Sequence, residues 1–477
     1  MVKLPYDPSG GAKFWEAIRK LPGFPLHETM PIKHMIFESD ALFKTTEILK
    51  SVGACQDKLL IVVMDETRMY REGIDLKTQM LDKLGEDGWQ LQVCILPADE
   101  SGQVHTDMLH IQQVQTTLRL GCSVLSIGSG VVTDIAKHGC FLYQRETGEK
   151  IPFVVFQTAN SVSAYTSNMS PTFVDGVKRT LDSRYPDALV CDLETLRDAP
   201  MEMTVGGVGD MLAVFVSFPD WTLAHHLGMD STYSELAKNL VGPLSELLFE
   251  HSAGIRSGEL ESVGVLAKVI ALGGLAMSLS HATTPMSGFE HVMSHVLDLK
   301  AEIEHAPLAM HGSQVALATL AGAEMYRCFL SDFDPLLVYL DNCYPALESM
   351  KARVENSFAE IDPTGKAGAE CWVDYSQKLE KWHAHRKDFE SVLKEWDVIR
   401  ALLKAETRSP EMIRQILLAV GAPTRWSQLT PPIDEKTARY AFMHASLMRK
   451  RMTLGDLLIF TGWDREALWD KIWKDYA

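Results

Sequence analysis

The sequence predicts two architectures in one chain: an α/β domain over residues 31–200 and an all-helical domain over residues 201–477. Three observations support this division. Short apolar runs alternate with segments of helical spacing up to about residue 200, two glycines follow one of these runs, and strand-like runs nearly vanish after residue 200. Strands that alternate with helices are typical of parallel sheets covered by helices.

The elements of the first domain follow from the length and spacing of its apolar runs. Continuous apolar runs such as Leu59–Met64 are typical of strands that are covered on both faces. The predicted strands are Leu59–Met64, Leu91–Leu96, Ser123–Ile127 and Ile151–Phe156, and the predicted helices are Ile74–Leu84 and Ile111–Leu120. We expect right-handed crossovers between the parallel strands.

The segments outside the first domain have different residue patterns and compositions. Glycine-punctuated helical patterns predict helices at Val208–Phe218, Ser234–His251, Ser262–Ser280 and Gly312–Tyr326. Residues 345–405 are charged and contain tryptophans, which predicts an inserted helical hairpin on the surface. Residues 1–30 are rich in proline and glycine, with one short amphipathic piece at Ala12–Lys20, and are expected to form an N-terminal extension.

Composition narrows the class of protein. The net charge of -17 repels phosphate backbones and anionic membranes, so a nucleic-acid partner is not expected. Eight scattered cysteines without a Cys-x-x-Cys pair are typical of reduced thiols in the cytoplasm. The N-terminal residues show no signal peptide. Val263–Leu279 comes nearest to a membrane span, but Lys268 interrupts it, so we expect a buried helix and no membrane insertion.

A glycine loop is the first candidate site. Gly128, Ser129 and Gly130 follow the predicted strand Ser123–Ile127 and open a helix-like segment. Glycines at this place let backbone N–H groups approach a diphosphate, and the helix N-terminus favours its negative charge. The spacing meets the Gly-x-Gly-x-x-Gly fingerprint only in part. An ordinary tight turn between strand and helix explains the pattern equally well.

Polar residues at two strand ends extend this candidate cofactor site. Asp65 ends the run Leu59–Met64, where an acid can bind the ribose 2′-hydroxyl and repel a 2′-phosphate, which favours NAD over NADP. The alternative role of Asp65 is a helix N-cap. Thr158, Ser161 and Ser167 follow the last predicted strand and could line the cofactor cleft, although a plain polar loop would look the same.

The second candidate site is a set of possible metal ligands. Asp210, His291 and His311 offer one carboxylate and two imidazoles, a set that leaves one coordination position open for water or substrate. His295 lies four residues after His291 and shares its helix face, so it could transfer a proton, bind substrate or simply pack. Such mixed ligands suit Zn, Fe(II), Ni or Mn.

The order of these segments resembles the superfamily of iron-containing alcohol dehydrogenases, glycerol dehydrogenase and 3-dehydroquinate synthase. The glycerol-1-phosphate dehydrogenase branch is the most similar. The matching pieces are Gly128–Lys137, Asp192–Pro200, Gly206–Asp210, Asp220–His225, Ser287–His291, His311–Gly312 and Arg449–Leu454. The resemblance covers roughly residues 31–460.

The resemblance implies roles for individual residues. Asp210, His291 and His311 take the places of the catalytic metal ligands. Further residues fall in the segments that contact the dinucleotide, namely Gly128, Ser129, Gly130, Asp134, Lys137, Thr158 and Ser161. The implied fold is a Rossmann-like nucleotide domain followed by a helical metal-binding domain, as in dehydroquinate synthase. Related enzymes form dimers or larger assemblies, so a homo-oligomer, most simply a dimer, is expected.

Two positions depart from the family pattern. Ser163 stands where the family has an aspartate near the substrate, and Val214 stands where it has a lysine after the metal-binding aspartate. The loss of a carboxylate and an ammonium from one pocket changes its charge and its supply of protons. The departures bear on the substrate, which in the family branch is glycerol-1-phosphate, and leave the metal and the cofactor largely untouched.

The leading hypothesis is a metal-dependent, NAD(P)-linked dehydrogenase. It would transfer hydride between the nicotinamide and a small alcohol or carbonyl, such as a polyol phosphate, with Zn, Fe or Ni as the metal, and with His295 and Ser163 as catalytic candidates. A second hypothesis is a lyase or cyclase of the 3-dehydroquinate synthase kind, which uses NAD transiently. A third is a non-catalytic binding protein, against which the intact ligand set argues, because buried polar groups without a function cost stability.

Overall fold

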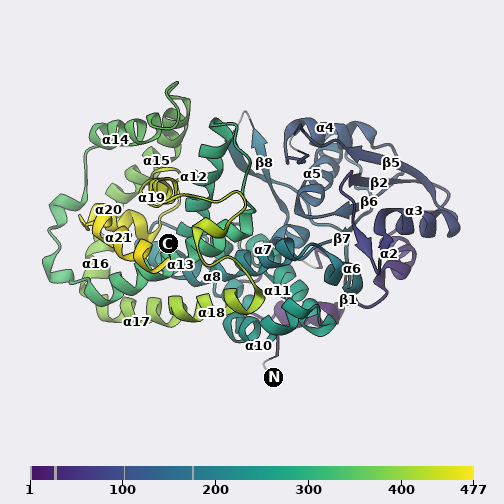
Figure 1. Cartoon of the computed structure of the whole chain (residues 1–477), viewed down its shortest axis with the longest axis horizontal. Helices are drawn as coiled ribbons and strands as arrows, with labels where there is room; N and C mark the ends of the chain where they lie inside the picture. The colour runs from purple at the N-terminus through teal and green to yellow at the C-terminus, as the bar shows by residue number, and fades with distance from the viewer. Residues whose placement is uncertain (1–2, 26–29, 101, 175–176, 477) are drawn as a thin grey trace. The chain divides into compact units, whose positions relative to one another are not determined.

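The structure is a computed structural model that describes residues 3–25, 30–100, 102–174 and 177–476 (Figure 1). The chain forms two compact units. The first contains Met1–Met211 and Glu235–Leu279, and the second contains Leu212–Ser234 and Ser280–Ala477. The predicted boundary near residue 200 divides the chain differently, because the segment 235–279 belongs to the α/β unit.

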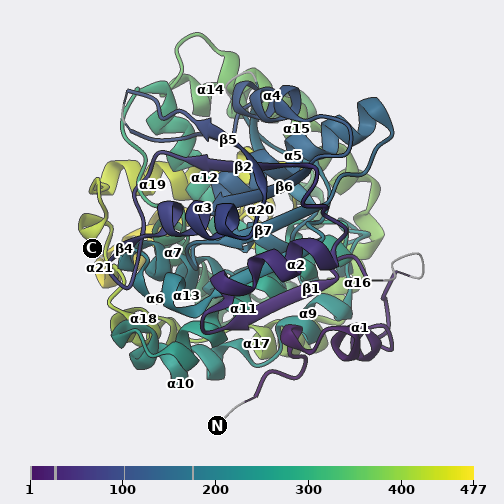
Figure 2. The same ribbon diagram turned by 90° about the vertical axis from the view of Figure 1, so that its right-hand side faces the viewer.

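A six-stranded parallel sheet forms the centre of the first unit. Its strand order is β1-β10-β7-β6-β2-β5 (Figure 2). The strands are β1 (His34–Glu38), β2 (Leu59–Asp65), β5 (Gln90–Leu96), β6 (Ser123–Gly128), β7 (Phe153–Gln157) and β10 (Ala188–Asp192). Every residue of β6, β7 and β10 is buried, as expected for central strands that are covered on both faces.

Helices cover the sheet of the first unit. The apolar sides of α2 (Thr45–Ser51) and α3 (Leu76–Glu86) pack with β2, β6 and β7 in one hydrophobic cluster. The pair α4 (Met108–Thr117) and α5 (Gly130–Thr147) also lies against the sheet. The other elements are η1 (Pro8–Gly10), α1 (Ala12–Ile18), η2 (Ala41–Lys44), β3 (Tyr70–Arg71), β4 (Ile74–Asp75), η3 (Ser163–Thr166), β8 (Met169–Val174), β9 (Val177–Asp182), α6 (Leu193–Asp198), α7 (Met201–Leu212), α9 (Glu235–Val241), α10 (Leu244–Ser257) and α11 (Leu260–Leu279).

The predicted elements of the first unit are present, with local differences. The four predicted strands occur as β2, β5, β6 and β7, whereas β1 and β10 were not predicted. The first predicted helix begins at Leu76, not at Ile74, because the side chain of Asp75 caps it by accepting a hydrogen bond from the Thr78 amide at 2.8 Å. The predicted helix 234–251 is two helices, α9 and α10, separated by Gly242 with a positive φ of 61°.

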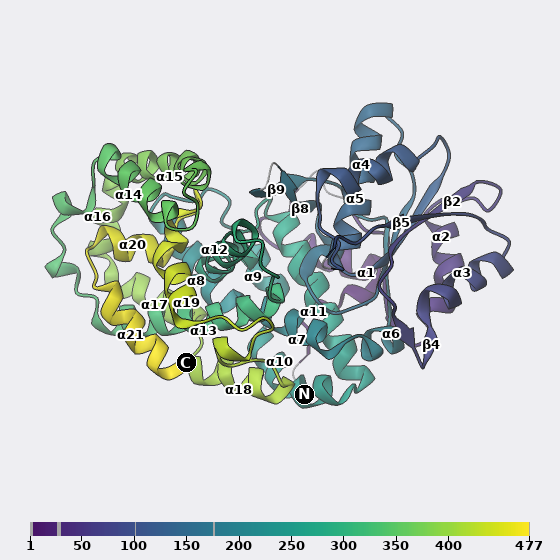
Figure 3. The same cartoon turned by 45° about the horizontal axis from the view of Figure 1, so that its top comes forward.

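The second unit is built from helices (Figure 3). They are α8 (Val214–His226), η4 (Thr284–Met286), α12 (Phe289–Ile303), α13 (His311–Asp332), η5 (Pro335–Leu337), η6 (Leu340–Cys343), α14 (Leu347–Ala359), α15 (Lys366–Ala384), α16 (Arg386–Lys394), α17 (Trp396–Glu406), α18 (Pro410–Val420), η7 (Trp426–Gln428), α19 (Glu435–His444), η8 (Ala445–Leu447), α20 (Leu454–Phe460) and α21 (Arg465–Tyr476). Asp220 of α8 joins three of them. Its buried carboxylate accepts hydrogen bonds from the Phe289 amide, the Leu454 amide and the Tyr326 hydroxyl.

The predicted insertion near 345–405 is four helices, α14 to α17, and it belongs to the core of the second unit. Trp382 is fully buried and stacks on Phe460 with ring centroids 4.7 Å apart. Lys378 of α15 forms an ion pair of 2.6 Å with Asp456 of α20, and both side chains are completely buried. A surface hairpin would not place a charged group inside the protein, so these residues have a structural role.

Two apolar helical stretches, Met201–His226 and Leu260–Leu279, have the length and composition of membrane spans. In each, 83% of the most apolar window is buried inside the structure. Such burial is typical of a core helix, as the sequence predicts for the second stretch. The eight cysteines form no disulfide among the described residues.

Candidate metal centre and cofactor site

The glycines of the turn from β6 to α5 are required by the close packing of the protein around them. A Cβ atom on Gly130 would lie 2.3 Å from Cγ2 of Val162, and one on Gly128 would lie 2.4 Å from Cβ of Val132. Ser129 occupies the N-cap position, but its side chain makes no capping hydrogen bond. The Gly130 N–H interacts with the Tyr165 hydroxyl, and the next backbone N–H groups of the first turn of α5 can donate to a bound anion, such as a diphosphate.

The sheet topology places Asp65 beside this turn. From β2 the chain continues to β5 on one side, and it then returns to β6 on the other side of β2. Parallel sheets bind ligands at such a switch point, outside the carboxyl ends of the strands. The register pairs Met64 with Ile127, so Asp65 and Gly128 end neighbouring strands at the same edge.

The Asp65 carboxylate already has a cationic partner. The ammonium group of Lys77 forms an ion pair with it, and the exposed fractions of the two side chains are 9% for Lys77 and 13% for Asp65. Lys77 also donates to the backbone carbonyls of Asp65 at 2.6 Å and Thr67 at 2.7 Å. The negative charge of Asp65 is therefore compensated inside the protein, which the sequence did not predict.

Most of the other predicted cofactor residues hold the local structure together. Lys137 pairs with Asp134 at 2.7 Å and donates to the Ala164 carbonyl at 2.9 Å, which fixes η3 against α5. The Ser161 hydroxyl lies 3.0 Å from the Tyr165 hydroxyl. The Ser167 hydroxyl accepts a hydrogen bond from the Met169 amide at 3.0 Å. These side chains shape the loop after β7, and their contacts are with protein groups.

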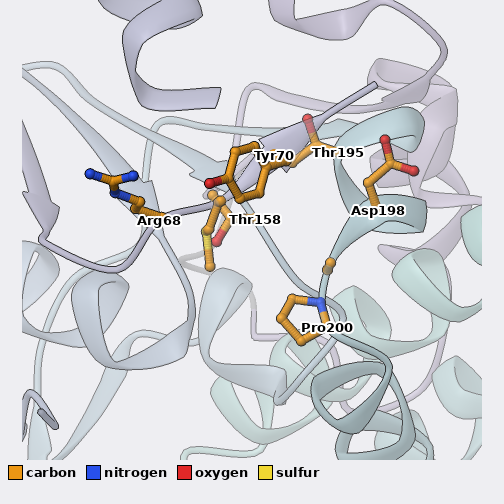
Figure 4. A pocket seen from close by; sticks show the side chains of 8 residues that line it. Arg68, Tyr70, Thr158, Thr195, Asp198 and Pro200 are labelled. Carbon is orange, nitrogen blue, oxygen red and sulfur yellow. The ribbon is translucent and has the colours of Figure 1, made fainter. Parts of the chain in front are cut away.

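Thr158 lines a pocket at the carboxyl edge of the sheet (Figure 4). The pocket encloses about 310 Å³, part of it open to solvent. The Thr158 hydroxyl is buried and has no hydrogen-bond partner in the described part of the protein. Tyr70 lies close to it, with Arg68 on one side and Asp198 on the other. A buried hydroxyl without a partner costs free energy unless a ligand or a water completes its bonding.

The candidate metal ligands converge. One ligand atom from each of Asp210, His291 and His311 lies within 4.8 Å of the other two. A point central to three atoms so spaced lies within about 2.8 Å of each. Zinc bonds to nitrogen and oxygen are roughly 2.0–2.2 Å long, so ligand atoms this close together suit one shared ion. Asp210 lies in the last turn of α7, and the Ser163 hydroxyl donates a long hydrogen bond of 3.5 Å to its Oδ2.

Neighbouring polar groups orient the two imidazoles. Nδ1 of His291 lies 2.8 Å from Oε1 of the fully buried Glu290, which also accepts from the Gly288 amide at 2.6 Å. An acceptor at Nδ1 holds the proton there and leaves the Nε2 lone pair of His291 for a metal.

A second chain of hydrogen bonds fixes the tautomer of His311. The Ser294 hydroxyl donates its proton to Oε1 of Gln314 at 2.9 Å, so it must accept from Nδ1 of His311, which lies 3.1 Å away. The amide nitrogen of Gln314 donates to Asp298 at 3.2 Å and to the Ala309 carbonyl at 3.1 Å, which sets the direction of the chain. His311 also presents Nε2.

His295 lies beside the two predicted ligand imidazoles. Its ring centroid is 6.3 Å from that of His291 and 6.1 Å from that of His311, and it stacks on His311 with an angle of 12° between planes. A proton could therefore pass between His295 and a small molecule bound at the ligand set.

Comparison with known proteins shows what the chain is similar to. Residues 36–200 match the profile of the iron-containing alcohol dehydrogenases. The chain is 28% identical over 350 residues to an NAD(P)+ glycerol-1-phosphate dehydrogenase from Bacillus subtilis (strain 168), which covers 73% of this chain and 85% of the relative. The chain is therefore similar to iron-containing alcohol dehydrogenases over residues 36–200 and to glycerol-1-phosphate dehydrogenases over most of its length. The corresponding enzyme of Geobacillus thermodenitrificans is 28% identical over 360 residues, covering 72% of this chain and 85% of the relative.

Solved structures of iron-containing alcohol dehydrogenases and glycerol dehydrogenases show the same fold. An archaeal alcohol dehydrogenase from a Red Sea brine pool aligns with a TM-score of 0.55 at 11% identity, over 95% of this chain and 99% of that protein. A probable glycerol dehydrogenase from Sinorhizobium meliloti aligns with a TM-score of 0.53 at 16% identity, over 92% and 95% of the two chains. The predicted fold class, the resemblance to this family and the oxidoreductase class are confirmed. NAD(P) and a divalent metal ion agree with this family.

The structure describes the two positions at which the sequence departs from the pattern expected from the resemblance. Ser163 lies next to Asp210, so a neutral hydroxyl replaces a carboxylate beside a proposed ligand. Val214 is 2% exposed at the start of α8 and brings no charge to the site. Both changes remove an ionisable group and leave the ligand atoms in place.

Sequence reasoning missed the residues that support the ligands. Glu290, Ser294 and Gln314 are buried and polar, and each lies within four residues of a predicted ligand along the chain. A glutamate directly before His291 was a usable signal, because carboxylates commonly accept from metal-binding imidazoles. The roles of Ser294 and Gln314 depend on the packing of α12 against α13 and have no local signature.

Proposed function

We propose that this chain is a metal-dependent, NAD(P)-linked dehydrogenase for a small alcohol and its carbonyl counterpart. The convergence of ligand atoms from Asp210, His291 and His311 within 4.8 Å carries the proposal. One carboxylate and two imidazoles, each imidazole with Nδ1 engaged elsewhere, form a site for Zn²⁺, Fe²⁺ or Ni²⁺ that keeps a position open.

The donor set fits a divalent ion, and the residues around it supply the other functions. A bound ion would act as a Lewis acid on the substrate oxygen. Asp210 brings the one negative charge of the ligand set, which partly balances a divalent cation. Ser163 offers a hydroxyl that can hydrogen-bond either to Asp210 or to substrate. His295, stacked on His311, is the proposed group that takes up or returns the hydroxyl proton.

The cofactor side also fits its proposed ligand. The amides that follow Gly130 at the start of α5 are open to a diphosphate, and the unpartnered Thr158 hydroxyl marks a pocket for the adenosine end. The nicotinamide would accept or give the hydride. Lys137 and Asp134 act by fixing the loop after β7.

We propose a polyol phosphate of the glycerol-1-phosphate class as the first substrate to test, because the curated relatives carry that name. The neutral Ser163 and Val214 are expected to shift preference toward substrates that need neither the family's carboxylate nor its ammonium. A cytoplasmic location is proposed on the eight unpaired cysteines, and a homodimer on the family resemblance alone.

The test is to replace His291 with alanine in the full chain and to measure bound metal and turnover. We expect wild-type protein to hold about one divalent ion per chain, and His291→Ala to lose both the ion and activity by roughly a thousand-fold or more. His383→Ala is the matched control, because it removes an exposed imidazole from α15 of the same unit. Full metal content and turnover in His291→Ala would refute the proposal.

The absorbance of free NADH separates the dehydrogenase from a cyclase. A dehydrogenase changes NADH in proportion to product, whereas a cyclase that oxidises and re-reduces one cofactor within each turnover leaves it constant. A panel of alcohols, aldehydes and polyol phosphates, each tested with NAD and NADP, then identifies the substrate class. Protein without stoichiometric metal would instead favour a binding protein without catalysis.

A further inference from the structure

Arg68 is an exposed cation at the proposed adenosine pocket, and it interacts electrostatically with Asp75. It lines the pocket on the segment that leaves β2, three residues after Asp65. Its guanidinium forms no hydrogen bond or ion pair with the residues that the structure describes. In Figure 4 it lies on the side of Tyr70 away from Asp198.

Two acidic groups near the pocket, Asp65 and Asp198, are already neutralised by other cations, whereas Asp75 interacts electrostatically with Arg68 itself. Asp65 is paired with Lys77, whose three protons go to Asp65 side-chain and backbone oxygens and to the Thr67 carbonyl. Asp198 accepts from Arg197 at 2.7 Å and from the Glu72 amide. An anion at the pocket mouth would therefore meet the guanidinium of Arg68, which Asp75 offsets without forming an ion pair, and two carboxylates whose charges are already paired.

The pocket has the character of an adenosine site. Thr158 supplies a buried hydroxyl without a partner, Tyr70 supplies a half-exposed aromatic ring, and Thr195 stands at the start of α6. All three lie at the carboxyl edge of the sheet, where the ends of β7 and β10 meet the segment after β2. In such folds an acid near the ribose selects NAD, and a nearby arginine accepts the 2′-phosphate of NADP.

We propose that Arg68 binds the 2′-phosphate of NADP(H), so that this chain accepts NADP(H) despite the acid at the end of β2. The proposal rests on the proposed dehydrogenase function and specifies one residue of its cofactor site. It reverses the preference for NAD that Asp65 alone would predict, because Lys77 removes the repulsion and Arg68 adds an attraction.

The test uses cofactor fragments and the full chain, so that it needs neither substrate nor turnover. Binding of 2′,5′-ADP and of 5′-ADP is measured by calorimetry for wild type, Arg68→Gln and Arg119→Gln. Arg119 is the matched control, because it is an exposed arginine at the opposite, amino edge of the same sheet and its loss changes net charge equally.

We expect wild type to bind 2′,5′-ADP at least as tightly as 5′-ADP. Arg68→Gln should weaken 2′,5′-ADP by about ten- to a hundred-fold, the effect of losing a charged hydrogen bond, and should change 5′-ADP by less than about two-fold. Arg119→Gln should change neither. The Arg68 effect should shrink at high salt, since an exposed charge pair is screened.

Two outcomes overturn the proposal. Wild type that binds 5′-ADP but not 2′,5′-ADP would show that Asp65 still excludes the phosphate. Equal losses of 2′,5′-ADP in the Arg68 and Arg119 variants would show a general charge effect. Failure of wild type to bind either fragment would contradict the cofactor part of the proposed function itself, which is a different result from loss of the 2′-phosphate preference.

Discussion

The two units carry their candidate functional residues in different ways. The first unit uses backbone: a glycine turn, the edge of a parallel sheet and the open start of α5. The second unit uses side chains, and each ligand imidazole is held by a polar group that is itself held, as in the series from His311 to Ser294 and Gln314. The glycine turn depends on the absence of side-chain atoms, and the ligand imidazoles depend on hydrogen bonds.

This difference decides which substitutions each unit tolerates. A turn built on glycines is disrupted when an added side-chain atom overlaps its packed neighbours. A set of hydrogen-bonded side chains is disrupted when one partner is removed and a buried polar group is left unsatisfied. Added volume should therefore damage the first unit most, and lost partners should damage the second. The following variants test that contrast.

The largest expected effect is on the stability of the second unit. Lys378→Met leaves the buried carboxylate of Asp456 without its cation and should lower the free energy of unfolding by about 3–5 kcal/mol. Denaturant unfolding measures it, with Lys366→Met, an exposed position on the same helix, as control. The double variant Lys378→Met, Asp456→Leu should recover much of the loss. An unchanged midpoint for the single variant would contradict the buried pair.

The first unit should respond to one added methyl group. Gly130→Ala places a Cβ 2.3 Å from Val162, so either the turn or Val162 must move, at a cost of about 1–3 kcal/mol. We expect weaker binding of NADH and a lower melting temperature. Adding Val162→Ala should restore both. If the second change gives no recovery, the clash is not the cause.

The residues that hold the proposed ligand imidazoles should affect the affinity of the protein for the metal ion. Glu290→Gln keeps the shape of the side chain but weakens the hold on Nδ1 of His291, and the metal dissociation constant should rise by about ten-fold or more. Competition with a chelator measures it. Glu302→Gln, on the partly exposed end of the same helix, serves as control. Equal metal affinity in both variants would remove Glu290 from the ligand support.

The smallest expected effect is on the pH dependence of the free energy of unfolding. Burial raises the pKa of Asp220 from 3.8 to about 7, against three hydrogen bonds that lower it. The folded protein then holds a proton that the unfolded chain releases, so this contribution to stability is complete below about pH 4 and is lost as pH rises toward 7. The stability of Asp220→Asn should fall less between pH 4.5 and 7.5, roughly the window set by that shift. Parallel curves would contradict the raised pKa.

Local patterns suggest candidate residues in the backbone half of the proposed site more readily than in the side-chain half. Gly128, Gly130 and Asp65 were proposed as cofactor-site residues because a turn and the end of a strand are recognised from consecutive residues. Contacts between residues that are separated in the sequence leave no local pattern. Lys77 neutralises the carboxylate of a residue twelve positions earlier, and Lys378 of α15 pairs with Asp456 of α20.

The metal ligands fall between these cases. Their residue types were suggestive, but Asp210 and the two histidines are far apart in sequence, and the family resemblance was needed to group them. The assignment of α9 to α11 to the first unit was also beyond local pattern, because α11 contacts α6 and β1 through tertiary packing.

The most direct test is anomalous diffraction from crystals of the full chain, recorded at the absorption edge of the bound metal. The account predicts one peak, with an Asp210 oxygen and Nε2 of both His291 and His311 within roughly 2.0–2.2 Å. A peak bound through Nδ1, a peak without Asp210, or an ion held by other residues would contradict it.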